Sequence, residues 1–210
     1  MELLFNALIT LLVVIDPVGV AAAYSALTLH SSRGERARIA RKGVLIAAGI
    51  LYFFALTGNA FIAALGITIP AFRIAGGILL FFLAIDMILV RESGMRSATE
   101  GEKAEADERR EITVFPLAIP LIAGPGAITS VVLLMGGAWR DPWIAAGMLG
   151  VIGVALAITF VTLRLAGLLT RALGLTGTHV VGRVLGIVLA ALAVQFVLDG
   201  MRGAGWLPHP

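Results

Sequence analysis

The sequence predicts an all-α membrane protein with six transmembrane helices, arranged as two inverted three-helix repeats. Three observations lead to this prediction. Hydrophobic residues make up 59% of the 210 residues and charged residues 14%, whereas a soluble domain would be about a quarter charged. The apolar residues fall into six long stretches. Two of these stretches are interrupted near the middle by a proline, Pro17 in the first and Pro125 in the fourth.

The six apolar stretches are each long enough to cross a bilayer as a helix, which takes roughly 20 residues for about 30 Å of hydrocarbon. We expect the spans at residues 3–29, 43–65, 69–90, 112–137, 143–164 and 179–201. The first stretch has no basic segment before it and is too long for a signal peptide. We therefore expect it to remain in the mature protein as a transmembrane helix.

The basic residues predict how the spans are oriented. Thirteen lysines and arginines lie in or beside the loops after the first, third and fifth spans, against three on the other side. Because cytoplasmic loops are enriched in basic residues, we expect an inner-membrane protein with those loops in the cytoplasm and both termini outside. The excess of basic residues is then explained by contact with anionic head groups of the lipid bilayer. We expect no nucleic-acid partner.

The two halves of the chain are predicted to form an inverted repeat. With both termini outside, residues 1–90 and residues 112–201 enter the membrane from opposite sides. Residues 16–19 (DPVG) correspond to 124–127 (GPGA), and residues 77–86 (GILLFFLAID) correspond to 186–195 (GIVLAALAVQ). Inverted repeats with broken helices at their interface recur among transporters, so this organisation favours a transporter.

The segment between the two repeats differs in composition from the rest of the chain. Residues 91–111 include seven acidic and five basic residues and few apolar ones. We expect a solvated cytoplasmic linker, because such a composition cannot bury enough apolar surface to fold. A simple tether and a regulatory segment both stay open for this linker. Residues 202–210 are expected to form an external tail.

Four stretches of the chain resemble the MarC family of integral membrane proteins. They are residues 15–19 (IDPVG), 66–77 (GITIPAFRIAGG), 115–128 (FPLAIPLIAGPGAI) and 183–200 (RVLGIVLAALAVQFVLDG). The resemblance implies six spans and a distant relation to the LysE-type exporters. For some members it also implies proton-coupled transport of small neutral amino acids such as glycine, alanine and serine.

The two proline breaks predict a binding site from the chemistry of their residues. Asp16 before Pro17 is a helix N-cap followed by proline at the first helical position, and Gly124 before Pro125 repeats this start with glycine supplying conformational freedom in place of a cap. Each second half-helix then presents free amides and the positive end of its dipole, which suit a carboxylate. The carbonyl groups that end the first half-helices, and the Asp16 carboxylate, suit an ammonium group.

We therefore predict that a small zwitterionic amino acid binds between the breaks. The predicted substrate-binding residues are Asp16, Pro17, Gly19, Gly124, Pro125, Gly126, Ala127 and Thr129. Because glycine and alanine leave little side-chain bulk, the pocket should prefer glycine, alanine or serine to leucine. We expect Gly19→Val or Gly126→Val to abolish binding without unfolding the protein.

Two carboxylates, Asp16 and Asp86, are candidates for proton coupling. We expect Asp16 to remain charged and available to the ammonium group, because the helix end that follows it favours the ionised form. Asp86 is then the better proton candidate, since ionisable residues inside membranes are usually functional. It lies about 24 Å from the outer face by helical rise, so exposure to cytoplasmic water is the alternative. Asn59 is expected to form a hydrogen bond between helices.

Other classes of protein fit the sequence less well. Without cysteine there are no disulfides and no thiolate metal sites, and we expect no metal and no cofactor. No catalytic motif is recognisable, and all three histidines fall in loops or at ends, so an enzyme is not expected. A channel-like pore would share the broken helices, and a scaffold without transport activity would need no buried carboxylate. Both alternatives stay open, as does a homo-oligomer.

Overall fold

The computed structural model describes residues 2–29, 31–89, 113–139 and 141–208, and within these ranges all regular structure is helical. The elements are α1 (Glu2–Ile15), α2 (Pro17–Leu27), α3 (Arg33–Ala64), α4 (Ile69–Leu89), the π-helical segment η1 (Thr113–Ile122), α6 (Pro125–Ala138), α7 (Pro142–Arg164) and α8 (Ala166–Gly203). The predicted linker at residues 91–111 lies outside the described residues.

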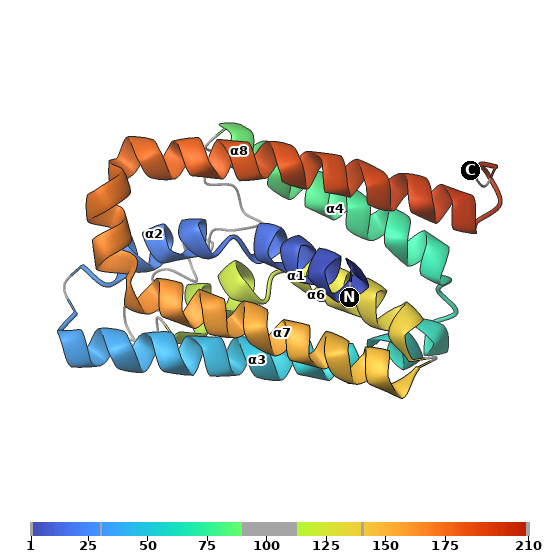
Figure 1. Ribbon diagram of the computed structural model, residues 1–210, viewed down its shortest axis with the longest axis horizontal. Helices are drawn as coiled ribbons and strands as arrows, with labels where there is room; N and C mark the ends of the chain where they lie inside the picture. The colour runs from blue at the N-terminus through green and yellow to red at the C-terminus, as the bar shows by residue number, and fades with distance from the viewer. Residues whose placement is uncertain (1, 30, 90–112, 140, 209–210) are drawn as a thin grey trace.

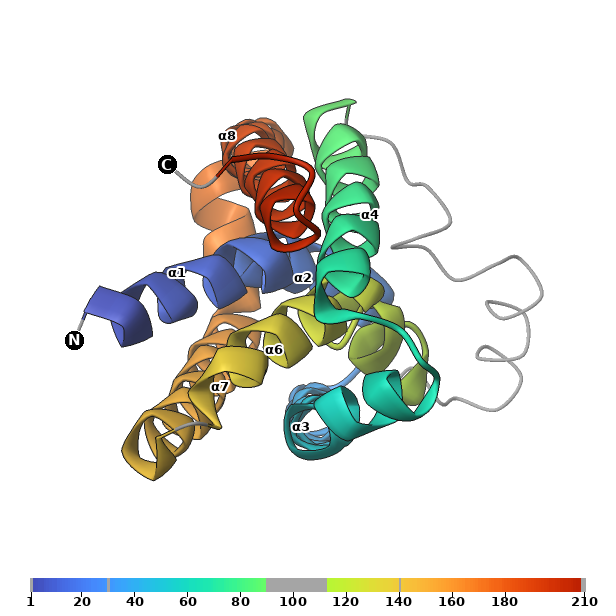
Figure 2. The same ribbon diagram turned by 90° about the vertical axis from the view of Figure 1, so that its right-hand side faces the viewer.

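The helices form three layers (Figures 1 and 2). Helices α4 and α8 run side by side in one outer layer, and α3 and α7 form the opposite outer layer. The interrupted helices, α1 with α2 and η1 with α6, lie between them. Contacts of α1 with α6 and α7, of α2 with α8, and of α6 with α3 and α4 hold this middle layer in place. Both breaks therefore lie in the middle layer, and the first of them, at Asp16, is buried.

Among the described residues, five helical stretches are long and apolar enough to cross a membrane. They are Glu2–Leu27, Arg33–Ala64, Ile69–Leu89, Pro142–Arg164 and Thr176–Gly203, and Pro125–Ala138 is a shorter apolar helix. Large apolar side chains such as Phe53, Phe82 and Ile187 are exposed on the outer surface, which suits contact with lipid tails rather than water. The prediction of an all-helical protein with several apolar helices is confirmed.

The second predicted span starts too late in the sequence. Helix α3 begins at Arg33 rather than at residue 43, because Ser32 and Glu35 form a capping box at its start. The Ser32 N–H donates to the Glu35 carboxylate at 2.8 Å, and the Glu35 N–H donates to the Ser32 hydroxyl at 3.3 Å. Hydropathy marks only the apolar part of a helix, so it missed these polar turns.

The last helix also begins early, but it contains a kink. Helix α8 starts at Ala166, and Gly174 interrupts it with φ 63° and ψ −179°. This left-handed value of φ is one that glycine adopts without strain. The part beyond the kink, Thr176–Gly203, is the membrane-spanning stretch. The predicted span at residues 179–201 is therefore correct for the apolar part of this helix.

Glycines allow α4 and α8 to pack closely. A Cβ atom on Gly77 of α4 would lie 2.7 Å from the Ala193 carbonyl oxygen of α8. A Cβ on Gly200 of α8 would lie 2.9 Å from the Pro70 carbonyl oxygen of α4, and one on Gly186 would lie 3.2 Å from that of Ala84. Small residues at such positions let helix backbones approach each other within a membrane.

Candidate functional site

The first break is a single residue, Asp16, between α1 and α2. Its backbone has φ 52° and ψ 69°, and among the described residues it alone combines a side chain with a positive φ. Aspartate tolerates this left-handed conformation better than most residues. The Asp16 carboxylate accepts a hydrogen bond of 3.1 Å from the Gly19 N–H, and Pro17 takes the first helical position. The predicted N-cap at this break is confirmed.

Gly19 is required by the capping turn itself. A Cβ at this position would overlap the Asp16 carboxylate. The Asp16 carboxylate is also almost completely buried, with 2% of the residue exposed, so it has little room to move away. This overlap argues against the expectation that Gly19→Val leaves the fold intact.

The second break has a different construction. Residue Gly124 has φ −72° and ψ 170°, an extended conformation that any residue can adopt. The prediction that glycine is needed here for conformational freedom is therefore wrong. No side chain caps α6, and the first amide bonded within the helix is that of Ile128, which donates to the Gly124 carbonyl at 3.0 Å. The amides of Gly126 and Ala127 precede it, so the helix itself does not satisfy them.

The two breaks lie close together in the middle layer. Helix α1 contacts α6, and α2 contacts η1. A Cβ on Gly126 would lie 3.4 Å from Val14 Cγ1, which belongs to the last turn of α1. Asp16, Ala127 and Thr129 are all buried. The structure thus brings Asp16 and the residues just after the second break into one buried region.

Helix α4 closes one side of this region. A Cβ on Gly126 would lie 2.7 Å from Leu80 Cδ2, and one on Gly76 would overlap the Thr129 methyl group. Gly126 and Thr129 therefore pack against α4. By contrast, Pro125 is exposed and Gly124 is half-buried, so the start of α6 reaches the surface.

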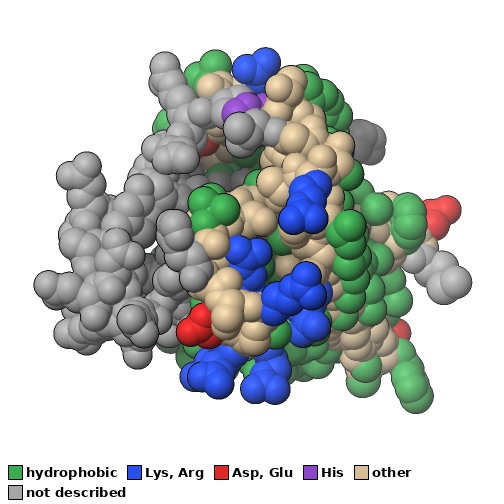
Figure 3. Space-filling model, turned by 90° about the vertical axis from the view of Figure 1, so that its left-hand side faces the viewer, with side chains coloured by type: hydrophobic (Ala, Val, Ile, Leu, Met, Phe, Trp, Pro, Cys, Tyr) green, Lys and Arg blue, Asp and Glu red, His purple; other side chains and the backbone are tan. Residues whose placement is uncertain are grey.

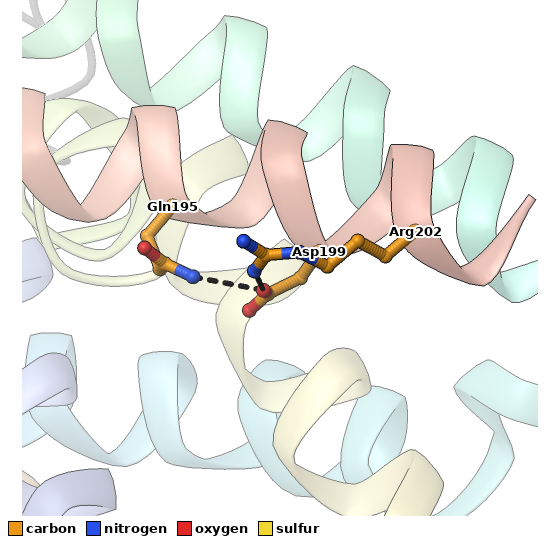
Figure 4. Close-up of polar contacts among 3 residues, drawn as sticks. All are labelled: Gln195, Asp199 and Arg202. Atoms are coloured by element: carbon orange, nitrogen blue, oxygen red, sulfur yellow. Dashed lines mark hydrogen bonds and ion pairs between the residues drawn. The ribbon is translucent and has the colours of Figure 1, made fainter. Parts of the chain in front are cut away.

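Asp86 lies just beyond the part of α4 that packs on the second break. It is half-buried in the last turn of α4, three residues and about 4.5 Å of helical rise beyond Leu83, whose Cδ2 would lie 3.5 Å from a Cβ on Gly126. Gln195, its counterpart in the predicted repeat, is exposed on α8 (Figure 4). There its Nε2 donates to Asp199 at 2.8 Å, and Arg202 forms an ion pair with the same oxygen at 3.1 Å. Asp86 and Gln195 thus do not belong to the buried region.

Two buried side-chain oxygens near α6 lack a hydrogen-bond partner. They are Asn59 Oδ1 on α3 and Ser130 Oγ on α6. Asn59 Oδ1 faces the backbone of α6, because a Cβ on Gly136 would lie 3.2 Å from it. The hydrogen bond between helices predicted for Asn59 is therefore not made by this oxygen. Buried polar atoms without partners are uncommon in folded proteins, and both of these lie beyond the second break, Asn59 at the α3–α6 interface and Ser130 on α6 itself.

Comparison with known proteins identifies similar chains. The family described as MarC family integral membrane protein matches residues 1–205. The UPF0056 membrane protein YvbG of Bacillus subtilis is 34% identical over 198 residues, which cover 94% of this chain and 93% of the relative. A UPF0056 membrane protein of Archaeoglobus fulgidus is 36% identical over 199 residues (94% and 91%), and YhcE of Escherichia coli is 33% identical over 203 residues (95% and 92%). No solved structure matches significantly.

Proposed function

Because this chain belongs to the MarC family of integral membrane proteins, we propose that it is a multi-pass inner-membrane transporter that moves small neutral amino acids by alternating access. The observation that carries this proposal is the pair of helix breaks at Asp16 and Gly124, which lie close together in the middle layer of the bundle. Irregular backbone at membrane depth is tolerated where it is buried in protein or lines a cavity. In transporters, such breaks form the substrate site.

The proposed topology counts each interrupted pair as one span. Helices α1 and α2 together form the first span, and η1 and α6 together form the fourth, which gives six spans in two inverted repeats. The equivalent positions of Pro17 and Pro125, each the first residue of a second half-helix, support this reading. Figure 3 shows several Lys and Arg side chains gathered at the end of the molecule where α2 ends, which we propose to be cytoplasmic, with the termini outside.

The substrate is proposed to be a zwitterion held between the breaks. Its carboxylate would accept hydrogen bonds from the Gly126 and Ala127 amides at the uncapped start of α6. Its ammonium group would donate to the Asp16 carboxylate. This carboxylate already accepts a bond from Gly19, but it has capacity for several. Since Leu80 fills the space beside Gly126, substrate entry requires α4 to move, as alternating access demands.

The proposed coupling ion is the proton, and Asp86 is the candidate residue that carries it. Its place in the last turn of α4 links it to the helix that closes the binding region. Protonation of this half-buried carboxylate would change the free energy of moving the end of α4 into the membrane interior. Coupling of α4 movement to the proton gradient would follow.

Uptake measurements in proteoliposomes test the proposed function. Purified protein is reconstituted, and entry of labelled alanine is followed with and without an imposed pH gradient. Saturable uptake with counterflow, accelerated by the gradient, is expected for a proton-coupled carrier. Flux that does not saturate would indicate a channel-like pore instead. Absence of flux for glycine, alanine and serine would favour a scaffold and contradict the proposal.

A further inference from the structure

A pocket of about 350 Å³ lies at the basic end of the molecule, apart from the two breaks. Helices α2, α3, α7 and α8 all contribute to its lining. Its polar lining consists of Tyr24, Ser25, Arg33, Arg36 and Arg164. Figure 3 shows the face of the molecule on which this end lies, with several Lys and Arg side chains close together. We call this feature the arginine pocket.

The fold fixes one of the three arginines in place. Arg36 donates from Nε to the Thr28 carbonyl oxygen at 2.9 Å and from Nη2 to the Leu29 carbonyl oxygen at 3.1 Å. The Tyr24 hydroxyl in turn donates to the Arg36 carbonyl oxygen at 2.6 Å. A guanidinium group has five N–H donors, so Arg36 keeps donors for a further partner.

The other two arginines bring their charge from separate elements. Arg33 lies in the first turn of α3, and Arg164 is the last residue of α7. In the described ranges, neither side chain forms a hydrogen bond or an ion pair with another residue. The salt bridge within these ranges joins Asp199 and Arg202 instead. Three guanidinium groups thus converge on one pocket without a carboxylate from the described part of the chain. Among the described residues, the lining of the pocket thus carries positive charge without a matching negative charge.

From this arrangement we propose that the arginine pocket binds a phosphate group, either the head group of an anionic phospholipid or a free phosphate ion. Guanidinium groups match phosphate oxygens with paired, charge-assisted hydrogen bonds. The hydroxyl groups of Tyr24 and Ser25 complete a polar lining. Basic pockets between membrane helices on the cytoplasmic side suit lipid head groups.

The rim of the pocket favours a lipid as the source of the phosphate. Leu168 lines the pocket and is 68% exposed, and its neighbour Leu165 is 46% exposed. Apolar side chains at the mouth of a charged pocket would contact acyl chains while the arginines hold the head group. A free phosphate ion would use only the arginines.

The experiment compares two double variants of the full chain. Arg33→Gln with Arg164→Gln removes two charges from the pocket. Arg38→Gln with Arg41→Gln removes two exposed charges from α3 outside it and serves as the matched control. All four side chains are exposed, so both variants should keep the wild-type melting temperature.

Two measurements distinguish the sources of phosphate. Native mass spectrometry measures phosphatidylglycerol retained from nanodiscs of phosphatidylcholine mixed with phosphatidylglycerol, and calorimetry measures binding of inorganic phosphate in detergent. We expect the pocket variant to bind phosphatidylglycerol at least about tenfold more weakly than the control variant does. Inorganic phosphate binding with the same dependence on the pocket arginines would assign the site to a free anion.

Either of two results would overturn the proposal. Equal losses in the pocket and control variants would show a general effect of surface charge and no specific site. Wild-type protein that retains phosphatidylcholine as well as phosphatidylglycerol, and does not bind inorganic phosphate, would show that the arginines do not select a phosphate anion. Neither result depends on whether the protein transports amino acids.

Discussion

The two helix breaks occupy equivalent places in the chain but satisfy their backbone groups in opposite ways. At the first break, Asp16 caps the following helix with its own carboxylate in a left-handed conformation. At the second, Gly124 is extended and offers no side chain, so the amides of Gly126 and Ala127 are not capped. The first break therefore caps its own helix, whereas the second has no side-chain cap for the amides that begin α6.

This difference suggests a division of labour within the proposed site. A capped helix end with a buried carboxylate supplies negative charge in a fixed position. An uncapped helix end supplies amide donors and the positive end of a dipole. A zwitterion needs one of each. Two identical breaks, both capped or both open, would match only one end of an amino acid.

The largest expected effect is that of adding a methyl group to the first break. Because a Cβ on Gly19 overlaps the Asp16 carboxylate, Gly19→Ala should break the cap and lower the free energy of unfolding by about 2 kcal/mol. At the second break, Gly126→Ala should cost less, because the atom it meets is the end of the flexible Leu80 side chain. Thermal unfolding in detergent compares the two variants.

Gly137→Ala is the control for these substitutions. Its Cβ would meet nothing within 4 Å, and it lies inside α6, so alanine should leave the stability unchanged or raise it slightly. If Gly19→Ala unfolds at the same temperature as Gly137→Ala, then the capping turn does not depend on glycine. The asymmetry between the two breaks would then lose its structural basis.

The next largest effect separates capping from charge at Asp16. Asparagine is also a good N-cap and tolerates the left-handed region, so Asp16→Asn should keep stability close to that of the wild type. Without the negative charge, alanine binding should weaken by about tenfold or more, since hydrogen bonds between charged groups are the strong ones. Asp16→Ala should lose both properties. Binding isotherms and melting curves, measured together, check this prediction.

Equal affinities in the Asp16→Asn variant and the wild type would show that Asp16 is only a structural cap. In that case the ammonium group must bind elsewhere, and the division of labour between the breaks would be wrong.

A smaller effect is expected when a cap is added to the second break. The extended backbone of Gly124 suits serine, whose hydroxyl would accept from the Gly126 or Ala127 amide. Gly124→Ser should therefore raise stability by a few tenths of a kcal/mol and weaken alanine binding several-fold, because the hydroxyl competes with the substrate carboxylate. Gly124→Ala adds bulk without an acceptor and is the matched control. Stronger binding in Gly124→Ser than in Gly124→Ala would contradict the proposed carboxylate position.

The sequence located both breaks within a residue, because an N-cap position followed by proline marks a helix start wherever it occurs. It could not distinguish their conformations, since the backbone angles of Asp16 and Gly124 depend on what packs around them. The contacts of Gly126 and Thr129 with α4 also depend on how the helices pack, which the sequence does not show. These residues looked like the lining of an open pocket because sequence shows their small size but not the helix that covers them.

The arginine pocket was missed for a related reason. Charge counting placed Arg33, Arg36 and Arg164 on one side of the membrane, and the described structure agrees in gathering them at one end. Their convergence depends on α7 ending beside the start of α3, which are far apart in the sequence. The available signal was that arginines lie at helix ends in two different loops. Hydrophobic periodicity does not show which helix ends meet, so it could not predict the pocket.

The smallest structural change is expected from Asp86→Asn, and it tests the part of the proposal that lies outside the breaks. Asp86 lies three residues beyond Leu83, the last residue of α4 that packs on Gly126, and is not one of the proposed substrate ligands, so its neutralisation should leave alanine affinity unchanged. Uptake without a pH gradient should also persist. Acceleration by the gradient should disappear, because the carboxylate that would carry the proton is gone. Gln195→Asn, an exposed change on α8, is the control and should keep the acceleration. Unchanged gradient dependence in Asp86→Asn would remove this residue from coupling and leave Asp16, or no proton coupling, as the remaining explanations.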